Sequence, residues 1–171
     1  MQMFVLSTDP YVSAHYLADV HVRVICREVS MCLSSWYYKN IGEHVEELPY
    51  RPFNHPVVDQ LSDINTRKWA ILNAYYIFRE FERRFNKKHA SEEKFNKILE
   101  YKDKYNPEMN YMCGSYRWRA KFSFVEKDKG VIKDLPIHDA VEKYREYYRN
   151  KLKTMKVAVK YTKTNKPDWS K

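Results

Sequence analysis

Only three glycines, Gly42, Gly114 and Gly130, occur in this chain of 171 residues. Tight β-turns depend on glycine, because it reaches backbone conformations that other residues rarely adopt. A fold with many hairpins is therefore disfavoured, and a P-loop or a dinucleotide-binding glycine motif is ruled out. Long segments instead carry apolar residues every three or four positions, which is typical of helices. We expect a mainly α fold, a compact bundle of four to five helices with one irregular or hairpin insertion.

The size and composition of the chain indicate one folded domain. Its length lies in the usual single-domain range, and 44% hydrophobic and 16% aromatic residues argue against a disordered chain. Residues 1–171 are therefore expected to form a single helical domain. Within it, we expect an irregular insertion at about 106–136 and a basic C-terminal segment at 141–171.

Residues 7–35 predict one long helix near the start of the chain. Asp9 is suited to cap its first free N–H groups, and Pro10 suits the first helical position. Asp19 and Arg23, four residues apart, are expected to form an ordinary solvated pair. The opposite, largely apolar face carries Ala14, Leu17, His21, Val24, Ile25, Glu28 and Cys32.

His21 and Glu28 are ionisable groups in this apolar stripe. Burying a carboxylate is costly unless it is hydrogen-bonded, paired or open to a cleft. Glu28 is therefore either a structural residue that bonds a tyrosine or arginine inside the bundle, or an acid/base carboxylate in a pocket with His21 and Arg27 nearby. His21 considered alone is expected to be a hydrogen-bonded core histidine.

The residues around Glu28 resemble a known family. The chain reads Leu-Ala-Asp-Val-His at 17–21 and, after five residues, Arg-Glu-Val at 27–29. This pattern is similar to the early segment of the bacteriophage endonuclease V family, the pyrimidine-dimer DNA glycosylases, which reads Leu-Ala-Asp-x-His, five residues, Arg-Glu-Leu. The resemblance implies that Glu28 is the catalytic carboxylate and that His21 and Arg27 contact DNA or support the site.

The same resemblance implies a nucleophilic amine at the N-terminus. The family uses the α-amino group of a small residue that is exposed when the initiator methionine is removed. Here Gln2 is too bulky for that removal, so the amine stays on Met1 or water takes its place. The α-amine is the most easily deprotonated amine of a chain, so Met1 is the expected nucleophile for any Schiff-base chemistry. No lysine on the first predicted helix offers a substitute.

A second resemblance covers most of the chain and points to a group of uncharacterised tailed-phage proteins. Members share an opening aromatic-aliphatic-x-Asp-x-Asp-Pro pattern, approximated here by residues 4–10. They also share a helical Asp-x-His with a glutamate seven residues after the histidine, as in Asp19, His21 and Glu28. A central His-Pro and a tyrosine-rich ending with Pro-x-Trp complete the pattern, at residues 55–56 and 167–169 here.

The charge of the chain predicts an anionic partner. It has 31 basic and 22 acidic residues, a net charge of +9 and a pI near 9.3. Nucleic acid is the commonest partner of a basic, aromatic-rich protein, although a basic surface can also serve only solubility. Residues 141–171 hold ten basic and three acidic residues. Lys151 and Lys153 are therefore candidates for anchoring duplex DNA.

Residues 116–122 alternate aromatic and basic side chains, as in a strand or an extended binding loop. One face would be aromatic and the other cationic, which suits a platform for a single strand or a flipped base. Arg117, Trp118 and Arg119 are therefore candidate substrate contacts. A hairpin that presses its aromatic residues onto the helices would give the same pattern, and the sequence does not decide between the two.

Further helices are predicted at 57–64, from 65 or 66 to about 88, from 92 to before 106, and from 137 onward. Asn54 or His55 is expected to cap the first of these, in preference to a catalytic role. The aromatic stripe of the second is expected to be core. The arginines near its end, among them Arg84, complement the helix dipole and could equally follow a phosphate backbone.

Metal and cofactor sites are not expected. Three cysteines and six scattered histidines show no metal-ligand spacing, so neither a zinc site nor a disulfide framework is indicated. No apolar run is long enough to span a bilayer, and no leader peptide is evident. We expect a protein of the cytoplasm, or of the host cytoplasm if it is viral.

The leading hypothesis is a DNA glycosylase, with or without abasic-site lyase activity, that acts on damaged or modified bases in duplex DNA with the target base flipped out. Glu28 would stabilise positive charge at the sugar or handle protons. The alternative is a non-catalytic basic phage protein that binds nucleic acid or a host factor. Substitution of Glu28 discriminates between the two, because only the enzyme needs its carboxylate.

Overall fold

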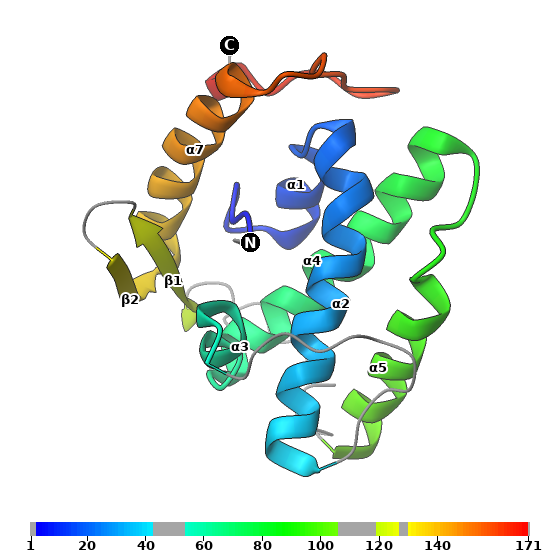
Figure 1. Ribbon diagram of the computed structural model, residues 1–171, viewed down its shortest axis with the longest axis vertical. Helices are drawn as coiled ribbons and strands as arrows, with labels where there is room; N and C mark the ends of the chain where they lie inside the picture. The colour runs from blue at the N-terminus through cyan, green and yellow to red at the C-terminus, as the bar shows by residue number, and fades with distance from the viewer. Residues whose placement is uncertain (1–2, 43–53, 106–118, 127–129, 171) are drawn as a thin grey trace.

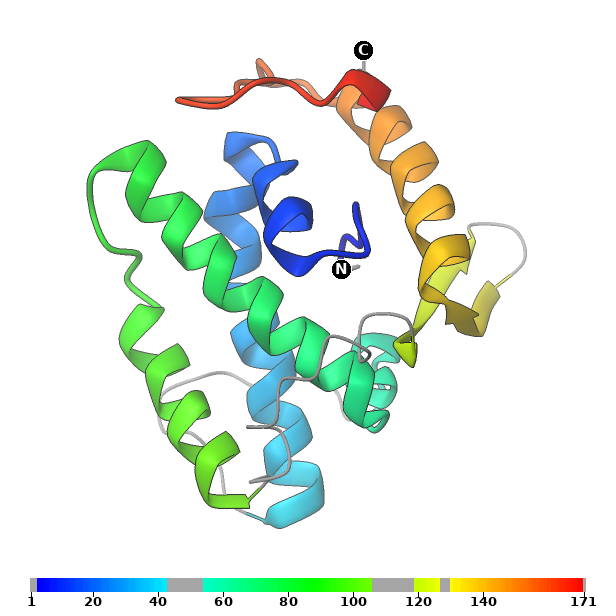
Figure 2. The ribbon, with the colours of Figure 1, turned by 180° about the vertical axis from the view of Figure 1, so that it is seen from behind.

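The computed structural model describes residues 3–42, 54–105, 119–126 and 130–170 of the chain, which are mainly helical, as predicted. Two long helices, α2 (Asp19–Ile41) and α4 (Ile64–Phe85), pack against each other at the centre. The short α1 (Pro10–His15) packs on α4, whereas α5 (Glu92–Tyr105) and α3 (Pro56–Gln60) pack on α2. Figure 1 shows this arrangement from one side and Figure 2 shows it from behind.

A second group of elements forms the other wall of the molecule. Strands β1 (Lys121–Glu126) and β2 (Gly130–Pro136) form an antiparallel hairpin with an irregularity between Phe122 and Phe124. Helix α7 (Ile137–Thr154) follows directly and rises away from the hairpin (Figures 1 and 2). The C-terminal segment, residues 155–170, then crosses over the top of α1 and α2 and ends in a short 3₁₀ turn (Asp168–Ser170).

The single helix predicted over residues 7–35 is wrong, because the chain forms two helices with a break at residues 16–18. Asp9 caps α1 as predicted, and its Oδ1 accepts hydrogen bonds from the backbone N–H groups of Tyr11 and Val12. At the break, backbone groups bond to distant side chains instead of continuing the helix. The carbonyl of Leu17 accepts from Arg84, and the N–H of Ala18 donates to the hydroxyl of Tyr148.

Arg84 is the residue that holds this break. Its side chain is fully buried and donates to the backbone carbonyls of His15 and Leu17 and to the carboxylates of Asp19 and Glu80, over 2.6–3.1 Å. Burial works to raise the pKa of Glu80, but hydrogen bonds from Arg83 and the charge of Arg84 lower it overall. A burial this complete excludes the phosphate contact considered for Arg84.

The C-terminal segment docks onto the same junction. The carboxylate of Asp19 accepts the backbone N–H of Thr162 at 3.0 Å and its hydroxyl at 2.6 Å. Asp19 is only 7% exposed, so the predicted solvated pair with Arg23 is wrong. Arg23 instead lies over the ring of Phe85, 4.3 Å from its centroid. The C-terminal segment therefore contributes hydrogen bonds to the folded structure.

Helices α4, α5 and α7 begin close to their predicted starts, whereas the helix predicted at 57–64 ends at Gln60, because Ile64 already begins α4. Helix α4 begins at Ile64, just before the predicted start at 65 or 66, and Asp63 caps it, because its Oδ1 accepts the N–H and the hydroxyl of Thr66. Asn86 ends α4 in the left-handed conformation, with a φ of 53°. The aromatic stripe of α4 is largely core, as expected: Trp69, Phe78 and Phe81 are buried.

The aromatic residues of β1 also belong to the core. Phe122 packs edge-on against Trp69, with ring centroids 5.1 Å apart, and Phe124 packs against Tyr144 at the same distance. For this part of the hairpin, the aromatic residues press onto the helices and do not form an open platform. No helix within the described residues is long and apolar enough to cross a membrane.

Candidate functional site

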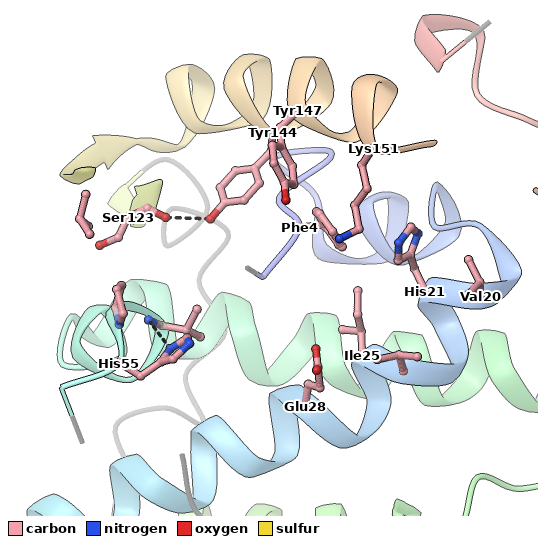
Figure 3. Close-up of a pocket in the computed structure, with 14 residues that line it drawn as sticks. Phe4, Val20, His21, Ile25, Glu28, His55, Ser123, Tyr144, Tyr147 and Lys151 are labelled. Atoms are coloured by element: carbon pink, nitrogen blue, oxygen red, sulfur yellow. Dashed lines mark hydrogen bonds between the residues drawn. The ribbon is translucent and has the colours of Figure 1, made fainter. Parts of the chain in front are cut away.

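The two walls of the molecule enclose a cavity of about 760 Å³, a size typical of ligand sites. Helices α2 and α3 form one side, and α7, the hairpin and the start of the chain form the other (Figure 3). The cavity combines apolar, aromatic and ionisable side chains from segments far apart in the sequence. Its lining residues are Phe4, Val20, His21, Val24, Ile25, Glu28, His55, Pro56, Val57, Ser123, Val131, Tyr144, Tyr147 and Lys151.

Three of the predicted site residues meet in this cavity: Glu28, His21 and Lys151. Glu28 and His21 come from α2, as the helical spacing predicted, and Lys151 comes from the last turn of α7. Glu28 points into the cavity from below, and Lys151 reaches down from the opposite wall in Figure 3. The cavity therefore presents a carboxylate and an ammonium group to the same space from opposite sides.

Other predicted site residues lie elsewhere. Arg27, Arg119 and Lys153 are exposed and do not line the cavity. An exposed cation can contact phosphate, but it cannot act on a group held inside. Arg117, Trp118 and Met1 are outside the described residues, although Phe4, three residues after Met1, is part of the cavity wall.

The protonation of His21 is fixed by a hydrogen-bond chain. The Tyr148 hydroxyl accepts the backbone N–H of Ala18 at 2.8 Å and lies 2.7 Å from Nδ1 of His21. When this hydroxyl donates to Nδ1, the neutral imidazole carries its proton on Nε2. Burial, and secondarily the charge of Lys151, lower the pKa of His21 to about 4. His21 is thus a neutral N–H donor at neutral pH.

Lys151 lies against aromatic rings. Its Nζ is 5.6 Å from the centroid of Phe4 and 5.9 Å from that of Tyr147, within the range of cation–π attraction. The ring of Phe4 is itself fixed by edge contacts with His21 and Tyr148, at 5.2 and 4.8 Å between centroids. Aromatic residues on α7 and at the start of the chain therefore hold the amine at the cavity wall.

The opposite end of the cavity is built from backbone and capping contacts. His55 caps α3, as expected, since its Nδ1 accepts the N–H of Val57 at 3.2 Å. The Tyr144 hydroxyl donates to the carbonyl of Ser123 at 2.7 Å, and the Ser123 N–H donates to Oε1 of Gln60. Burial raises the pKa of Tyr144, so its phenol stays protonated. These bonds tie the hairpin to α7 and α3 and fix the shape of the cavity.

The cavity also exposes apolar surface to solvent. Val24 on α2 and Val131 on β2 are 47% and 42% exposed, and both line it. Apolar side chains in a concave site, next to a few polar groups, are the usual composition of a small-molecule or base-binding pocket. A flat aromatic ligand would cover these valines while it reached the polar groups.

Sequence reasoning missed several lining residues, among them Phe4, Ser123 and Tyr147. For Tyr147 a signal exists, because it lies four residues before Lys151 and both therefore share one face of a helix. No local pattern marks Ser123, which reaches the cavity only through the pairing of the hairpin with α7. Phe4 lies in the apolar opening of the chain, where no local pattern indicates its role.

Comparison of the chain with protein-family models, with curated proteins and with solved structures gives no significant match. Among the described residues, no group of three or more histidine, cysteine, aspartate or glutamate side chains is arranged to hold a metal ion. The chemistry on view is that of a half-buried carboxylate, a neutral imidazole and a primary amine around an apolar space.

Proposed function

We propose that this protein is a DNA glycosylase that removes a damaged or modified base from duplex DNA. The observation that carries the proposal is the position of Glu28, which lines one cavity together with His21 and Lys151. A flipped nucleotide needs a pocket with apolar walls and a few polar groups. This cavity has such a composition and a volume of about 760 Å³.

In this proposal Glu28 acts at the sugar. Breaking the bond between the base and the sugar develops positive charge on the sugar ring, which a nearby carboxylate stabilises. The same carboxylate can orient a water molecule for attack on the sugar. His21 donates its Nε2–H to an acceptor atom of the substrate, and Lys151 supplies positive charge close to the reacting nucleotide.

The exposed cations outside the cavity have a different role in the proposal. Arg27, Arg119 and Lys153 contact phosphates of the duplex, and the net charge of +9 favours binding in general. Such contacts position the DNA without reading a base. The excess of basic over acidic residues in the C-terminal part of the chain supports this interpretation.

The direct test is base release by wild-type protein and by Glu28→Gln. The duplexes should carry ultraviolet lesions, abasic sites or phage-type modified bases, with released bases detected by chromatography and nicks on gels. We expect Glu28→Gln to slow base release by about 100-fold or more while DNA affinity persists. Glu93→Gln, an exposed glutamate on α5, is the matched control and should leave the rate unchanged.

The alternative, a non-catalytic nucleic-acid-binding protein, predicts other results. Wild-type protein would then release no base and make no nick on any of these duplexes, and the glycosylase proposal would be wrong. Glu28→Gln would leave both DNA affinity and its dependence on salt nearly unchanged. A salt titration of both proteins, measured by fluorescence anisotropy, therefore accompanies the activity assay.

A further inference from the structure

The amine of Lys151 is unusual among the charged groups of the described residues. It lies at the wall of the cavity that contains Glu28, and it is the only lysine among the lining residues. Within the described part of the chain, no carboxylate and no hydrogen-bond acceptor pairs with it, and its contacts are the rings of Phe4 and Tyr147. It is therefore available to a ligand.

Lys163, in contrast to Lys151, has its amine hydrogen-bonded within the fold. The Nζ of Lys163 donates to the carbonyl of Arg83 at 2.8 Å and to Oδ1 of Asn86 at 2.6 Å. That lysine is occupied in fastening the C-terminal segment. Lys151 instead lies over two aromatic rings next to a neutral histidine. Lysine amines are the groups with which enzymes form Schiff bases on carbonyl substrates.

We propose that Lys151 is a nucleophile that forms a Schiff base with the abasic sugar left after base removal. The inference rests on the proposed glycosylase function and assigns the amine of its lyase step to α7 instead of to Met1. The geometry that supports it is the opposition of Lys151 and Glu28 across the cavity (Figure 3). A sugar between them would have an amine on one side and a carboxylate on the other.

The proposed step balances without an external oxidant or reductant. The ammonium first loses a proton to water, and the neutral Nζ adds to the C1′ aldehyde of the open sugar. The neutral carbinolamine takes a proton back from water at its hydroxyl group and loses one water, which gives the iminium ion. Glu28 then takes a proton from C2′, and the 3′ phosphate leaves with the electron pair of its C3′–O bond, so the strand is cut. Addition of one water releases the unsaturated aldehyde and restores Lys151.

The test uses full-length protein and a duplex with a preformed abasic site, so that base release is not needed. Sodium borohydride reduces the iminium ion to a stable secondary amine, and peptide mass spectrometry locates the adduct. We expect the adduct on the peptide that contains Lys151. Lys151→Arg keeps the positive charge but forms no such adduct, so trapping should fall by more than about tenfold. Lys88→Arg, an exposed lysine between α4 and α5 that lies outside the cavity, is the matched control.

The possible outcomes separate the two proposals. An adduct on the N-terminal peptide, or full trapping by Lys151→Arg, overturns the assignment of Lys151 and leaves the glycosylase proposal standing. Base release without any adduct also overturns it, because the enzyme then uses water alone. Absence of base release from every lesion-bearing duplex overturns the proposed function itself, whatever the trapping result.

Discussion

Helix α2 carries two carboxylates with opposite surroundings. Asp19, at its first turn, is 7% exposed and accepts hydrogen bonds from Arg84 and from Thr162. Glu28, about two and a half turns later, is half-buried and lines a cavity. Each faces a cation from a distant helix: Arg84 on α4 for Asp19, and Lys151 on α7 across the cavity from Glu28.

The difference lies in how the cations are bonded. Arg84 makes four hydrogen bonds to backbone and carboxylate oxygens at one buried point, so its contacts stabilise the fold. Lys151 makes none to the described residues and is held only by ring contacts. The same helix thus contributes one charge to stability and another to a site. Burial and bonding, and not residue type, distinguish the two.

The largest effect is expected from Arg84→Met. It removes the buried cation that pairs with the carboxylates of Asp19 and Glu80 and donates to two backbone carbonyls, so the free energy of unfolding should fall by about 3–5 kcal/mol. Lys151→Met, the other half of the comparison, should change it by less than about 1 kcal/mol. Urea unfolding followed by circular dichroism measures both. Equal losses in the two variants would contradict the comparison.

The two carboxylates of α2 should also differ in how much each contributes to the free energy of unfolding. Asp19→Asn removes the charge that binds Arg84 and weakens the bonds from Thr162, for an expected loss of about 2–3 kcal/mol. Glu28→Gln should cost less than about 1 kcal/mol, because its side chain is half-buried at the cavity wall. Thermal and urea unfolding of both variants give the measurement. A Glu28→Gln protein less stable than Asp19→Asn would favour a structural role for Glu28.

On the cavity side, stability should depend on pH through His21. Its pKa is about 4 in the folded protein and about 6.5 in an unfolded chain, so between these values only the unfolded chain binds the proton. The stability is present above about pH 6.5 and is lost as the pH falls towards 4. Between pH 7 and pH 5 we expect a loss of about 2 kcal/mol.

His21→Gln isolates this contribution from that of other titrating groups. The variant should lose less stability between pH 7 and pH 5 than wild type, by about the same 2 kcal/mol. Unfolding in urea at the two pH values gives both differences. Identical losses in the two proteins would mean that His21 keeps an ordinary pKa.

The smallest effect is expected at the docked C-terminal segment. Thr162→Val removes the hydroxyl that donates to Asp19 at 2.6 Å and keeps the backbone bond, for an expected cost of about 1 kcal/mol. Thr154→Val, at the exposed end of α7, is the matched control and should cost less. Amide hydrogen exchange should be faster over residues 155–170 in Thr162→Val. Unchanged exchange there would show that the backbone bonds alone hold the segment.

The sequence predicted the features that depend on neighbouring residues. Asp9 and His55 cap helices as their positions indicated, and the helical face that carries His21 and Glu28 follows from the spacing alone. Helices α4, α5 and α7 begin close to their predicted starts for the same reason, and α5 also ends where predicted. The mainly α fold follows from helical periodicity in a chain with few glycines.

Features that depend on distant partners could not be predicted. The break after α1 exists because Arg84, 67 residues away from Leu17, takes up its carbonyl, and no local pattern indicates this. The cavity likewise depends on α7, which brings Tyr148 to His21 across 127 residues of sequence. Lys151 was expected to anchor DNA as one of many C-terminal cations. Its position across the cavity from the glutamate of α2 is a result of tertiary packing.

The bond between Asp19 and Thr162 also has a consequence for kinetics. It joins residues 143 positions apart, and closing so long a loop costs more conformational entropy than forming contacts within one helix. Such a contact is expected to form after the rate-limiting step of folding. Weakening it should then speed unfolding and leave the folding rate nearly unchanged. The docking of the C-terminal segment would therefore determine the lifetime of the native state and not the time needed to reach it.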